Sequence, residues 1–418
     1  MESLFRGRVV QRLWLDNPFL IDLLFLLGWV RIGDKFIHRF LNWFKQVEVN
    51  GMEIHLVGGF LGSGKTTAII NAAKSLMAQG KKVGVVTNDQ GKYLVDTAFF
   101  RLASIPAVEV TGGCFCCNYD DLDKRLDLLV ETAQPDVIFA ESVGSCADLV
   151  ATVIRPMLVY GGDRFMPASF SVFVDARLLR RRLAGQPLPF GDDVVYIFDK
   201  QLEEAGLIVV NKMDLLSEKG REEMPAQMAE RFPNVKWLMQ TSLTQEGVQP
   251  WLGIIGGGTP EGRRLLAASE PLEIDYARYG TGEAQLAWLD EEVQLTFPEG
   301  QGRALLHGLM SRFTGELAKR NAGIGHLKFI VQSEGSEQGK ISFTALESPD
   351  WESQIPDITG DRVDLLVNAR VEMGAEPLQA LFRQVLEESG MDFSIRSSAA
   401  FHPGQPKPTH RMRGSFEL

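Results

Sequence analysis

The segment Gly59-Phe-Leu-Gly-Ser-Gly-Lys-Thr66, followed by Thr67, matches the phosphate-binding pattern G-x-x-x-x-G-K-[ST]. An apolar run at residues 54–57 precedes it and a helical pattern at residues 66–79 follows it, which is the context that the pattern requires. The glycines let backbone N–H groups turn toward phosphates, and the helix N-terminus adds partial positive charge. The segment therefore predicts an α/β fold with a phosphate site after its first strand.

The residues of this loop have separate expected roles. Lys65 should reach the β- and γ-phosphates of a nucleotide, and Thr66 should ligate Mg²⁺ through its hydroxyl. A glycine-rich turn without a ligand is the alternative, and the strand and helix on either side disfavour it. The other nucleotide contacts expected from the loop come from Gly59, Gly62, Ser63, Gly64 and Thr67.

A second motif predicts which base is bound. The apolar run at residues 207–210 leads directly into Asn211-Lys212-Met213-Asp214, an N-K-x-D sequence. The Asp214 carboxylate can accept hydrogen bonds from N1–H and the exocyclic amine of guanine, whereas adenine would leave buried groups unpaired. Asn211 should buttress the loop and the base edge, and the stem of Lys212 should cover the ring. The sequence therefore favours GTP over ATP.

An acidic residue is expected beside the γ-phosphate. Residues 136–144 read as a buried strand that ends in Glu141-Ser-Val-Gly144. Glu141 should hold the Mg²⁺ shell or the attacking water, and Gly144 should donate its N–H to the γ-phosphate and move when that phosphate leaves. An exposed strand-end glutamate is the alternative. Lys65, Thr66 and Glu141 are therefore the predicted catalytic residues.

The pattern along the chain predicts several regions. Strands alternating with helices over 51–258 indicate a three-layer P-loop GTPase domain with a mainly parallel sheet. A glycine-rich break indicates a linker over 259–290. Strand and helix patterns over 291–396, including a helix at Gly302–Lys319, indicate a smaller α+β domain. The remaining regions are a helical, apolar and basic extension at 1–50 and a Pro- and Gly-rich tail at 397–418, which we expect to be flexible.

Composition limits the partners. The 418 residues include 54 acidic and 43 basic side chains, which give a net charge of −11. This balance argues against nucleic acid as the main partner, because phosphate backbones are bound by basic faces. The apolar run in the extension at 1–50 is too short to span a bilayer. We favour a helical extension docked on the protein or upstream sequence that the fold does not need, and weak contact with a membrane surface is the alternative. A second copy of the chain is a further candidate partner.

The four cysteines cluster instead of forming a disulfide framework. Three lie in Gly112-Gly-Cys114-Phe-Cys116-Cys117, and the fourth is Cys146. This spacing fits thiolate chemistry in a reducing compartment, and we expect a cytoplasmic protein. Thiolates suit Zn²⁺, Cu(I) and, with reservations, Co²⁺. Buried inert cysteines and a redox sensor are the alternatives.

These motifs together resemble the CobW-like family of metal-associated GTPases, related to the nickel-insertion GTPases of hydrogenase and urease maturation. The resemblance rests on G-G-F-L-G-S-G-K-T-T, G-G-C-F-C-C, E-S-V-G and N-K-M-D, over roughly residues 52–256. It implies a metallochaperone that binds Zn²⁺ or Co²⁺ at Cys114, Cys116 and Cys117. It also implies coupling of GTP hydrolysis to delivery of the metal to a client metalloprotein or cofactor enzyme.

Two features depart from the family pattern. Where the family typically has Asn-Glu-Phe-Gly-Glu, this chain has Asn88-Asp89-Gln90-Gly91-Lys92, so Asp89 keeps one carboxylate and Lys92 replaces the second. Asp89 is a candidate metal ligand on this basis. Cys146, two residues after Gly144, lies outside the signature and is a candidate fourth ligand whose contact would depend on the nucleotide.

The predicted activity is hydrolysis of GTP to GDP and phosphate with Mg²⁺, at a slow intrinsic rate because the sequence offers no obvious arginine finger. Two rival functions stay open. One is a GTP-dependent switch for maturation of a cobalamin or other metallocofactor enzyme, in which the cysteines are regulatory. The other is a redox-responsive regulator without meaningful turnover.

Overall fold

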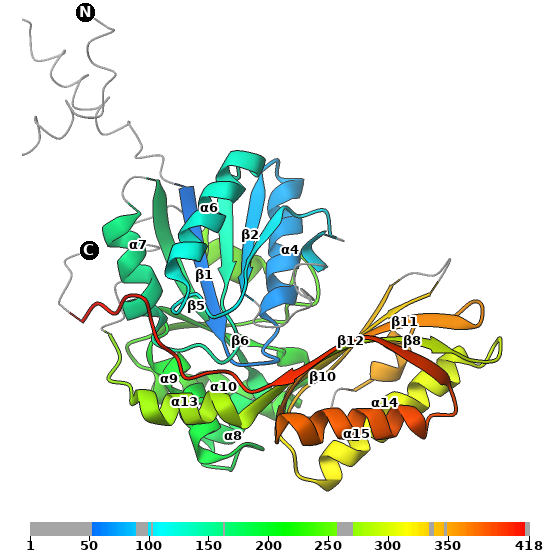
Figure 1. Ribbon diagram of the computed structural model, residues 1–418. Coiled ribbons are helices and arrows are strands. Elements are labelled where there is room, and N and C mark those ends of the chain that lie inside the picture. The colour runs from blue at the N-terminus through cyan, green and yellow to red at the C-terminus, as the bar shows by residue number, and fades with distance from the viewer. Residues whose placement is uncertain are drawn as a thin grey trace, which may run out of the picture. The chain divides into compact units, whose positions relative to one another are not determined.

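Seven strands form a parallel sheet in the order β3-β2-β4-β1-β5-β6-β7 (Figure 1). In this arrangement β1 pairs with β4 on one side and with β5 on the other, so the phosphate loop leaves the middle of the sheet. Such an order places the carboxyl ends of neighbouring strands at one edge, where ligands bind in open α/β sheets. The strands are β1 (Met52–Gly59), β2 (Val83–Asn88), β3 (Ala107–Val110), β4 (Val137–Glu141), β5 (Phe165–Asp175), β6 (Leu207–Asn211) and β7 (Lys236–Met239).

The structure is a computed structural model of the chain, and it describes residues 52–88, 99–101, 103–161, 164–256, 271–333, 338–346 and 349–413. The side chain of Met166 is not described. The expected extension at 1–50, with its membrane contact, lies outside these residues. So does the candidate metal ligand Asp89.

Helices cover both faces of the parallel sheet and create two apolar cores. On one face, α4 (Lys65–Ala78) and α11 (Gln249–Ile255) pack their apolar side chains against the strands. On the other face the core includes the apolar sides of five helices. They are α6 (Tyr119–Ala133), α7 (Arg155–Tyr160), α8 (Ala176–Leu183), α9 (Asp192–Glu203) and α10 (Glu218–Arg231). The predicted three-layer P-loop domain is confirmed.

Five antiparallel strands form a second sheet in the order β10-β9-β11-β8-β12. They are β8 (Leu286–Thr296), β9 (Ile324–Gln332), β10 (Gly339–Phe343), β11 (Arg362–Glu372) and β12 (Asp392–Phe401). One face of this sheet packs against α14 (Gly302–Lys319) and α15 (Ala375–Glu387) through a separate apolar core. The predicted smaller α+β domain is therefore confirmed, and its helix at Gly302–Lys319 has the predicted bounds.

The edges of this small domain differ from the predicted ones. The helix α13 (Tyr276–Gln285) and the first five residues of β8 occupy part of the predicted linker, 259–290. At the other end β12 continues past residue 396, because its residues up to Phe401 pair with β8. We define residues 402–413 as the strap. It makes backbone hydrogen bonds to the large domain, from Thr409 N to Cys116 O at 2.9 Å and from Met412 N to Ala151 O at 2.9 Å. These bonds hold a segment that the sequence predicted to be flexible.

Among the described residues, no helix is both long and apolar enough to cross a membrane.

Candidate nucleotide and metal site

The phosphate loop connects β1 to α4 in a conformation that only glycine tolerates at two key points. Gly59 and Gly64 have φ angles of +119° and +92°, in the range that side chains rarely adopt. A Cβ on Gly59 would also lie 2.1 Å from the carbonyl oxygen of Phe173 on β5. Within the loop, Lys65 Nζ donates hydrogen bonds to the carbonyls of Gly59, at 2.7 Å, and Phe60, at 3.3 Å. The lysine is thus folded back over the loop that it would use to hold phosphates.

Thr66 and Glu141 come together although they are far apart in sequence. Thr66 is the second residue of α4, the helix after β1, and Glu141 ends the neighbouring strand β4. Thr66 Oγ1 donates a 2.8 Å hydrogen bond to Glu141 Oε1, and both side chains are buried. Two oxygen ligands held in this way suit a hard divalent cation such as Mg²⁺. Gly144, three residues after Glu141, lines the same cavity as Lys65 and Thr66.

Asn211 joins the base-specifying motif to the phosphate loop. Its Nδ2 donates to Ser63 O at 2.8 Å, while its Oδ1 accepts from both the backbone N, at 3.1 Å, and the Oγ, at 2.8 Å, of Ser242. The asparagine is buried, so each of these hydrogen bonds satisfies a group that water cannot reach. The segment that contains Ser242 therefore lies beside the motif.

Lys212 and Asp214 occupy the rim of this region. Lys212 has a φ of +63°, and its Nζ lies 3.1 Å from a carboxylate oxygen of the buried Asp175, at the end of β5. Burial opposes the ionisation of Asp175, but the hydrogen bond from Arg177 and the charge of Lys212 hold its pKa below the usual value. Asp214 is exposed, with its backbone N bonded to Thr241 Oγ1 at 3.2 Å. Its carboxylate is therefore placed where a base could enter from solvent.

The cysteine loop follows β3 and gathers its three sulfurs closely. The Sγ atom of Cys114 lies 2.8 Å from that of Cys116 and 3.2 Å from that of Cys117, and the Cys116 and Cys117 sulfurs are 3.8 Å apart. The loop begins at Gly112 and Gly113, and Asn88 Nδ2 anchors it by a 2.7 Å hydrogen bond to Gly113 O. All four cysteines are free thiols. Three sulfurs within 4.8 Å of one another match a thiolate metal site.

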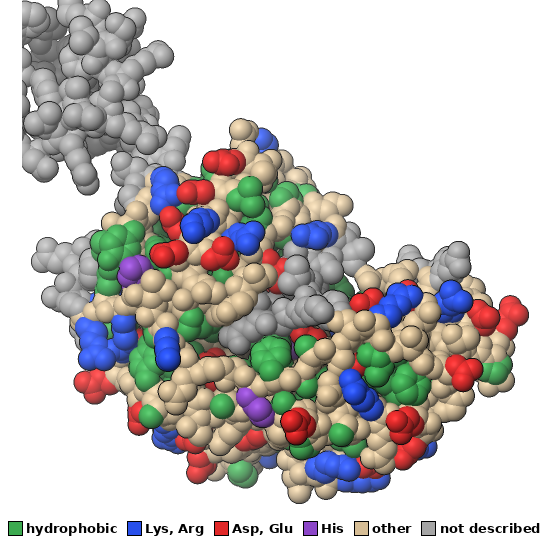
Figure 2. Space-filling view, in the orientation of Figure 1, with side chains coloured by type: hydrophobic (Ala, Val, Ile, Leu, Met, Phe, Trp, Pro, Cys, Tyr) green, Lys and Arg blue, Asp and Glu red, His purple; other side chains and the backbone are tan. Residues whose placement is uncertain are grey.

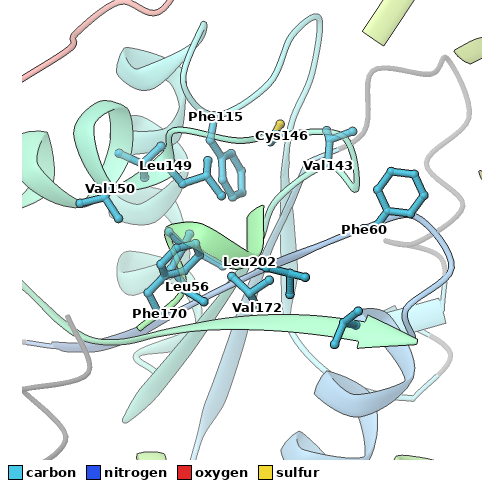
Figure 3. Packing of buried hydrophobic residues seen from close by; sticks show 14 of the residues in the cluster. Leu56, Phe60, Phe115, Val143, Cys146, Leu149, Val150, Phe170, Val172 and Leu202 are labelled. Carbon is cyan, nitrogen blue, oxygen red and sulfur yellow. The ribbon is translucent and has the colours of Figure 1, made fainter. Parts of the chain in front are cut away.

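Cys146 approaches this group from a different segment. It is fully buried in the large core, where Figure 3 shows its sulfur near Phe115 and Val143. Hydrogen bonds from the thiols of Cys116, Cys117 and Cys146 hold the pKa of Cys114 well below its ordinary value. The hydrogen bond to Cys114 raises the pKa of Cys117 to about 11. Cys114 is therefore the thiol whose ionisation its neighbours favour.

The strap runs across the cysteine loop. Lys407 N donates to Cys117 Sγ at 3.2 Å, and Thr409 Oγ1 donates to Cys117 O at 2.9 Å. Farther on, Arg411 Nε pairs with the buried Asp148 at 2.5 Å. In Figure 1 the red segment after β12 follows this path along the large domain toward α7. No sequence pattern predicts these contacts, because they depend on where the end of β12 lies in space.

The strap contains two histidines, His402 and His410, each with a defined partner. His402 Nε2 accepts a 3.0 Å hydrogen bond from Ala375 N, at the start of α15. His410 packs its ring against Tyr119 and Tyr160, with centroids 5.3 and 4.9 Å away. Neither histidine belongs to the group of sulfurs around Cys114.

The cavity beside the phosphate loop has a second wall that the sequence analysis did not foresee. Its volume is about 180 Å³, and the small sheet contributes His326, Lys328, Lys340 and Arg370 to its lining. The alternation of His326, Leu327, Lys328 and Phe329 within β9 was the available signal. That alternation predicts a two-faced strand, but not what its polar face meets. On the outer surface, by contrast, Figure 2 shows acidic and basic side chains interspersed over the visible face.

Residues 53–238 match the family model described as CobW/HypB/UreG, nucleotide-binding domain. A urease accessory protein UreG from Metallosphaera sedula is 31% identical over 170 residues, which cover 38% of this chain and 70% of that protein. The chain belongs to the CobW/HypB/UreG family.

Other relatives match the same region. A zinc chaperone CobW from a Sinorhizobium species is 30% identical over 231 residues, which cover 49% of this chain and 62% of that protein. A zinc chaperone YeiR from Escherichia coli is 30% identical over 164 residues, covering 38% of this chain and 46% of the relative. The chain therefore matches less than two thirds of the length of these chaperones.

Proposed function

We propose that the protein binds and hydrolyses GTP at its phosphate loop, and that it carries a transition metal, zinc foremost, on its cysteine loop. The observation that carries the proposal is the course of residues 141–146. Glu141 at one end accepts a hydrogen bond from Thr66 at 2.8 Å, Gly144 lines the nucleotide cavity, and the thiol of Cys146 at the other end is hydrogen-bonded to Cys114. Any shift of this segment on nucleotide binding or hydrolysis would move a sulfur.

The residues present fit the nucleotide. Lys65 would exchange its bonds to loop carbonyls for the β- and γ-phosphate oxygens, and Asp214 would pair with guanine from the exposed rim. Thr66 and Glu141 would hold Mg²⁺, which supplies positive charge to the β- and γ-phosphate oxygens. Glu141 is buried in the cavity wall beside Ser142 and Gly144, and would orient water at the γ-phosphate.

The four thiols suit a soft metal ion as the cargo that the protein carries. Cys114, Cys116 and Cys117 would supply three thiolates, and Cys146 would supply the fourth that completes a tetrahedral zinc site. The similarity to proteins named as zinc chaperones favours zinc over cobalt. Because thiols must lose protons to bind zinc, uptake should be accompanied by proton release.

Nucleotide and metal titrations of the full chain test this function. We expect binding of guanine but not adenine nucleotides, one zinc ion bound per chain in the reduced protein, and a slow GTPase rate that Lys65→Ala abolishes. Absence of thiol-dependent metal binding would overturn the metal half of the proposal. Absence of guanine nucleotide binding would overturn the other half.

Cys146→Ser tests the connection between the two sites. We expect this variant to bind zinc at least about tenfold more weakly and to lose the difference in zinc affinity between the GTP-analogue and GDP states. The size follows from losing one of four ligands, since changes even around a metal site cost about 10- to 100-fold. Ser145→Ala is the matched control, because it alters the neighbouring residue and keeps the sulfur. Equal zinc affinity in Cys146→Ser and the unmodified protein would exclude Cys146 as a ligand.

A further inference from the structure

The small sheet has one apolar face and one polar face. On β9, Leu327, Phe329 and Val331 belong to the core formed with α14 and α15. Successive side chains on a strand point to opposite faces, so His326 and Lys328 point away from that core.

The strand register brings further polar side chains to the same face. Lys328 lies opposite Asn368 on β11 and Ser342 on β10. His326 lies opposite Arg370, and Lys340 lies opposite Ile330. Because cross-strand partners share a face, Lys328, Lys340 and Arg370 gather on the side opposite the two helices.

This polar face is docked directly on the phosphate loop. A Cβ on Gly62 of the loop would lie 2.6 Å from Thr344 Cγ2, and one on Gly325 of β9 would lie 2.6 Å from Leu61 Cδ1. The loop and the sheet approach too closely for a side chain at either glycine. A phosphate chain held by Lys65 therefore has the polar face of the sheet as its opposite wall.

The charge of the cavity suits a polyphosphate. Among the described residues that line it, Lys65, Lys212, Lys328, Lys340 and Arg370 are basic, and Glu141 is the sole carboxylate. This excess of positive charge stands in a chain whose net charge is −11. Three of the five cations come from the small sheet.

The cations of the small sheet are positioned by their neighbours. Arg370 is 2% exposed and its guanidinium lies on the ring of Trp288, while Lys340 Nζ lies 3.9 Å from the ring centroid of Phe99. The buried Asp290 accepts a 2.6 Å hydrogen bond from Asn368 Nδ2. Burial, with the charge of Cys114, raises the pKa of the nearby Glu283 to about 8, while the hydrogen bond from Ser145 and the charge of Arg370 oppose this shift.

We propose that Lys328, Lys340 and Arg370 bind the terminal phosphate of GTP, so that the small sheet distinguishes GTP from GDP. This inference rests on the proposed function, because it assumes that the phosphate loop holds a guanine nucleotide. GDP has no γ-phosphate, so it cannot engage cations on the far wall of the cavity. The small domain thereby becomes the part of the protein that recognises the triphosphate, in place of an arginine supplied by a partner.

The test compares two affinities in the full-length protein with Mg²⁺ present. Lys328→Ala, Lys340→Ala and Arg370→Ala should each weaken the binding of a non-hydrolysable GTP analogue about tenfold or more, since a hydrogen bond to a charged group contributes about 1.5–3 kcal/mol. The affinity for GDP should change less than twofold. Calorimetric or fluorescence titration gives both dissociation constants.

Two controls separate phosphate binding from folding. Lys328→Arg and Lys340→Arg keep the charge and should keep most of the discrimination between the two nucleotides. Arg396→Ala removes an arginine from the same sheet that pairs with Asp364 at 3.1 Å and does not line the cavity, so it should leave both affinities unchanged. Arg370 is buried, so the two lysine variants decide the matter if Arg370→Ala does not fold.

Two outcomes overturn the inference. One is an unchanged GTP-analogue to GDP affinity ratio in both lysine variants, and the other is an equal loss of affinity for the two nucleotides. Either result would leave the proposed function standing, provided that the unmodified protein binds both. Failure of the unmodified protein to bind any guanine nucleotide would instead overturn the proposed function.

Discussion

The two sheets of this protein present polar side chains in different ways. The parallel sheet is covered by helices on both faces, so its chemistry lies at the strand ends, where Asn88, Glu141 and Asn211 follow buried runs. The antiparallel sheet is apolar on one face only, and its polar side chains stand along the middle of the strands, as Lys328 and Arg370 do. A parallel sheet thus concentrates polar groups at one edge, whereas a two-faced sheet offers a surface.

The largest predicted effect is a loss of stability, and it concerns the apolar face of the small sheet. Phe329 is fully buried between Phe313 of α14 and Phe343 of β10, with ring centroids 6.4 and 6.0 Å away. Phe329→Ala should lower the free energy of unfolding by about 3–5 kcal/mol, as large-to-small core changes do.

Urea unfolding followed by fluorescence measures this change. Phe329→Leu, which keeps most of the apolar volume, should cost about 1.5 kcal/mol or less. A Phe329→Ala variant as stable as Phe329→Leu would mean that this face is not the tightly packed core described above.

A smaller effect, on nucleotide affinity, is expected from a change at the edge of the parallel sheet where the strands end. Asn211→Ala removes the hydrogen bonds to Ser63 O and Ser242 and leaves buried groups unpaired, at about 1–3 kcal/mol for each unsatisfied group. We expect guanine nucleotide affinity to fall at least about tenfold in a binding titration, because Ser63 belongs to the phosphate loop. Asn118→Ala removes an exposed 3.0 Å bond to Thr111 O and should change the affinity less than twofold. Equal effects of the two changes would refute the role of Asn211 as a brace.

The smallest effect concerns a titratable group inside the parallel sheet. His55 on β1 is buried beside Ser169 Oγ, at 2.9 Å, and burial lowers its pKa from 6.5 to about 4. The folded state therefore favours the neutral ring. The resulting stability is present above pH 6.5 and is lost as the pH falls toward 4, by about 2 kcal/mol at pH 5.

The measurement is the difference in unfolding free energy between pH 7 and pH 5. His55→Gln should show a difference about 2 kcal/mol smaller than that of the unmodified protein, since glutamine does not titrate. The same pH dependence in both proteins would exclude His55 as its source.

The contrast between the sheets also explains what could be predicted from sequence. The phosphate loop, the strand before Asn211 and the cysteine loop are contiguous stretches, so their residues could be identified in order along the chain. The polar face is assembled from β9, β10 and β11, which contribute one or two residues each. Its members share a face only once the register is known, and no short pattern in the sequence specifies that register.

Residues 402–413 were missed for a related reason. Their Pro, Gly and basic residues are typical of a mobile tail, and they form no helix or strand of their own. What orders them is a set of backbone hydrogen bonds to Cys116 and Ala151, more than 250 residues earlier in the chain. The composition of a segment does not indicate hydrogen bonds to residues so far away in the sequence. Asp89 lies outside the described residues, so its part in metal binding stays a prediction.

The strap gives the small domain a second connection to the large domain. Residues 286–401 enter from α13, which packs on α9, and leave through a segment bonded to the cysteine loop. The small sheet is therefore an insertion with two anchors in the large domain, not an appendage on a single hinge. Two anchors leave the small domain few rigid-body movements relative to the large domain. A rotation that moves the small domain away from one anchor also strains the contacts at the other. Cutting the chain after β12 would therefore leave the small domain attached through α13 alone. It would also remove the contacts that the strap makes with Cys117.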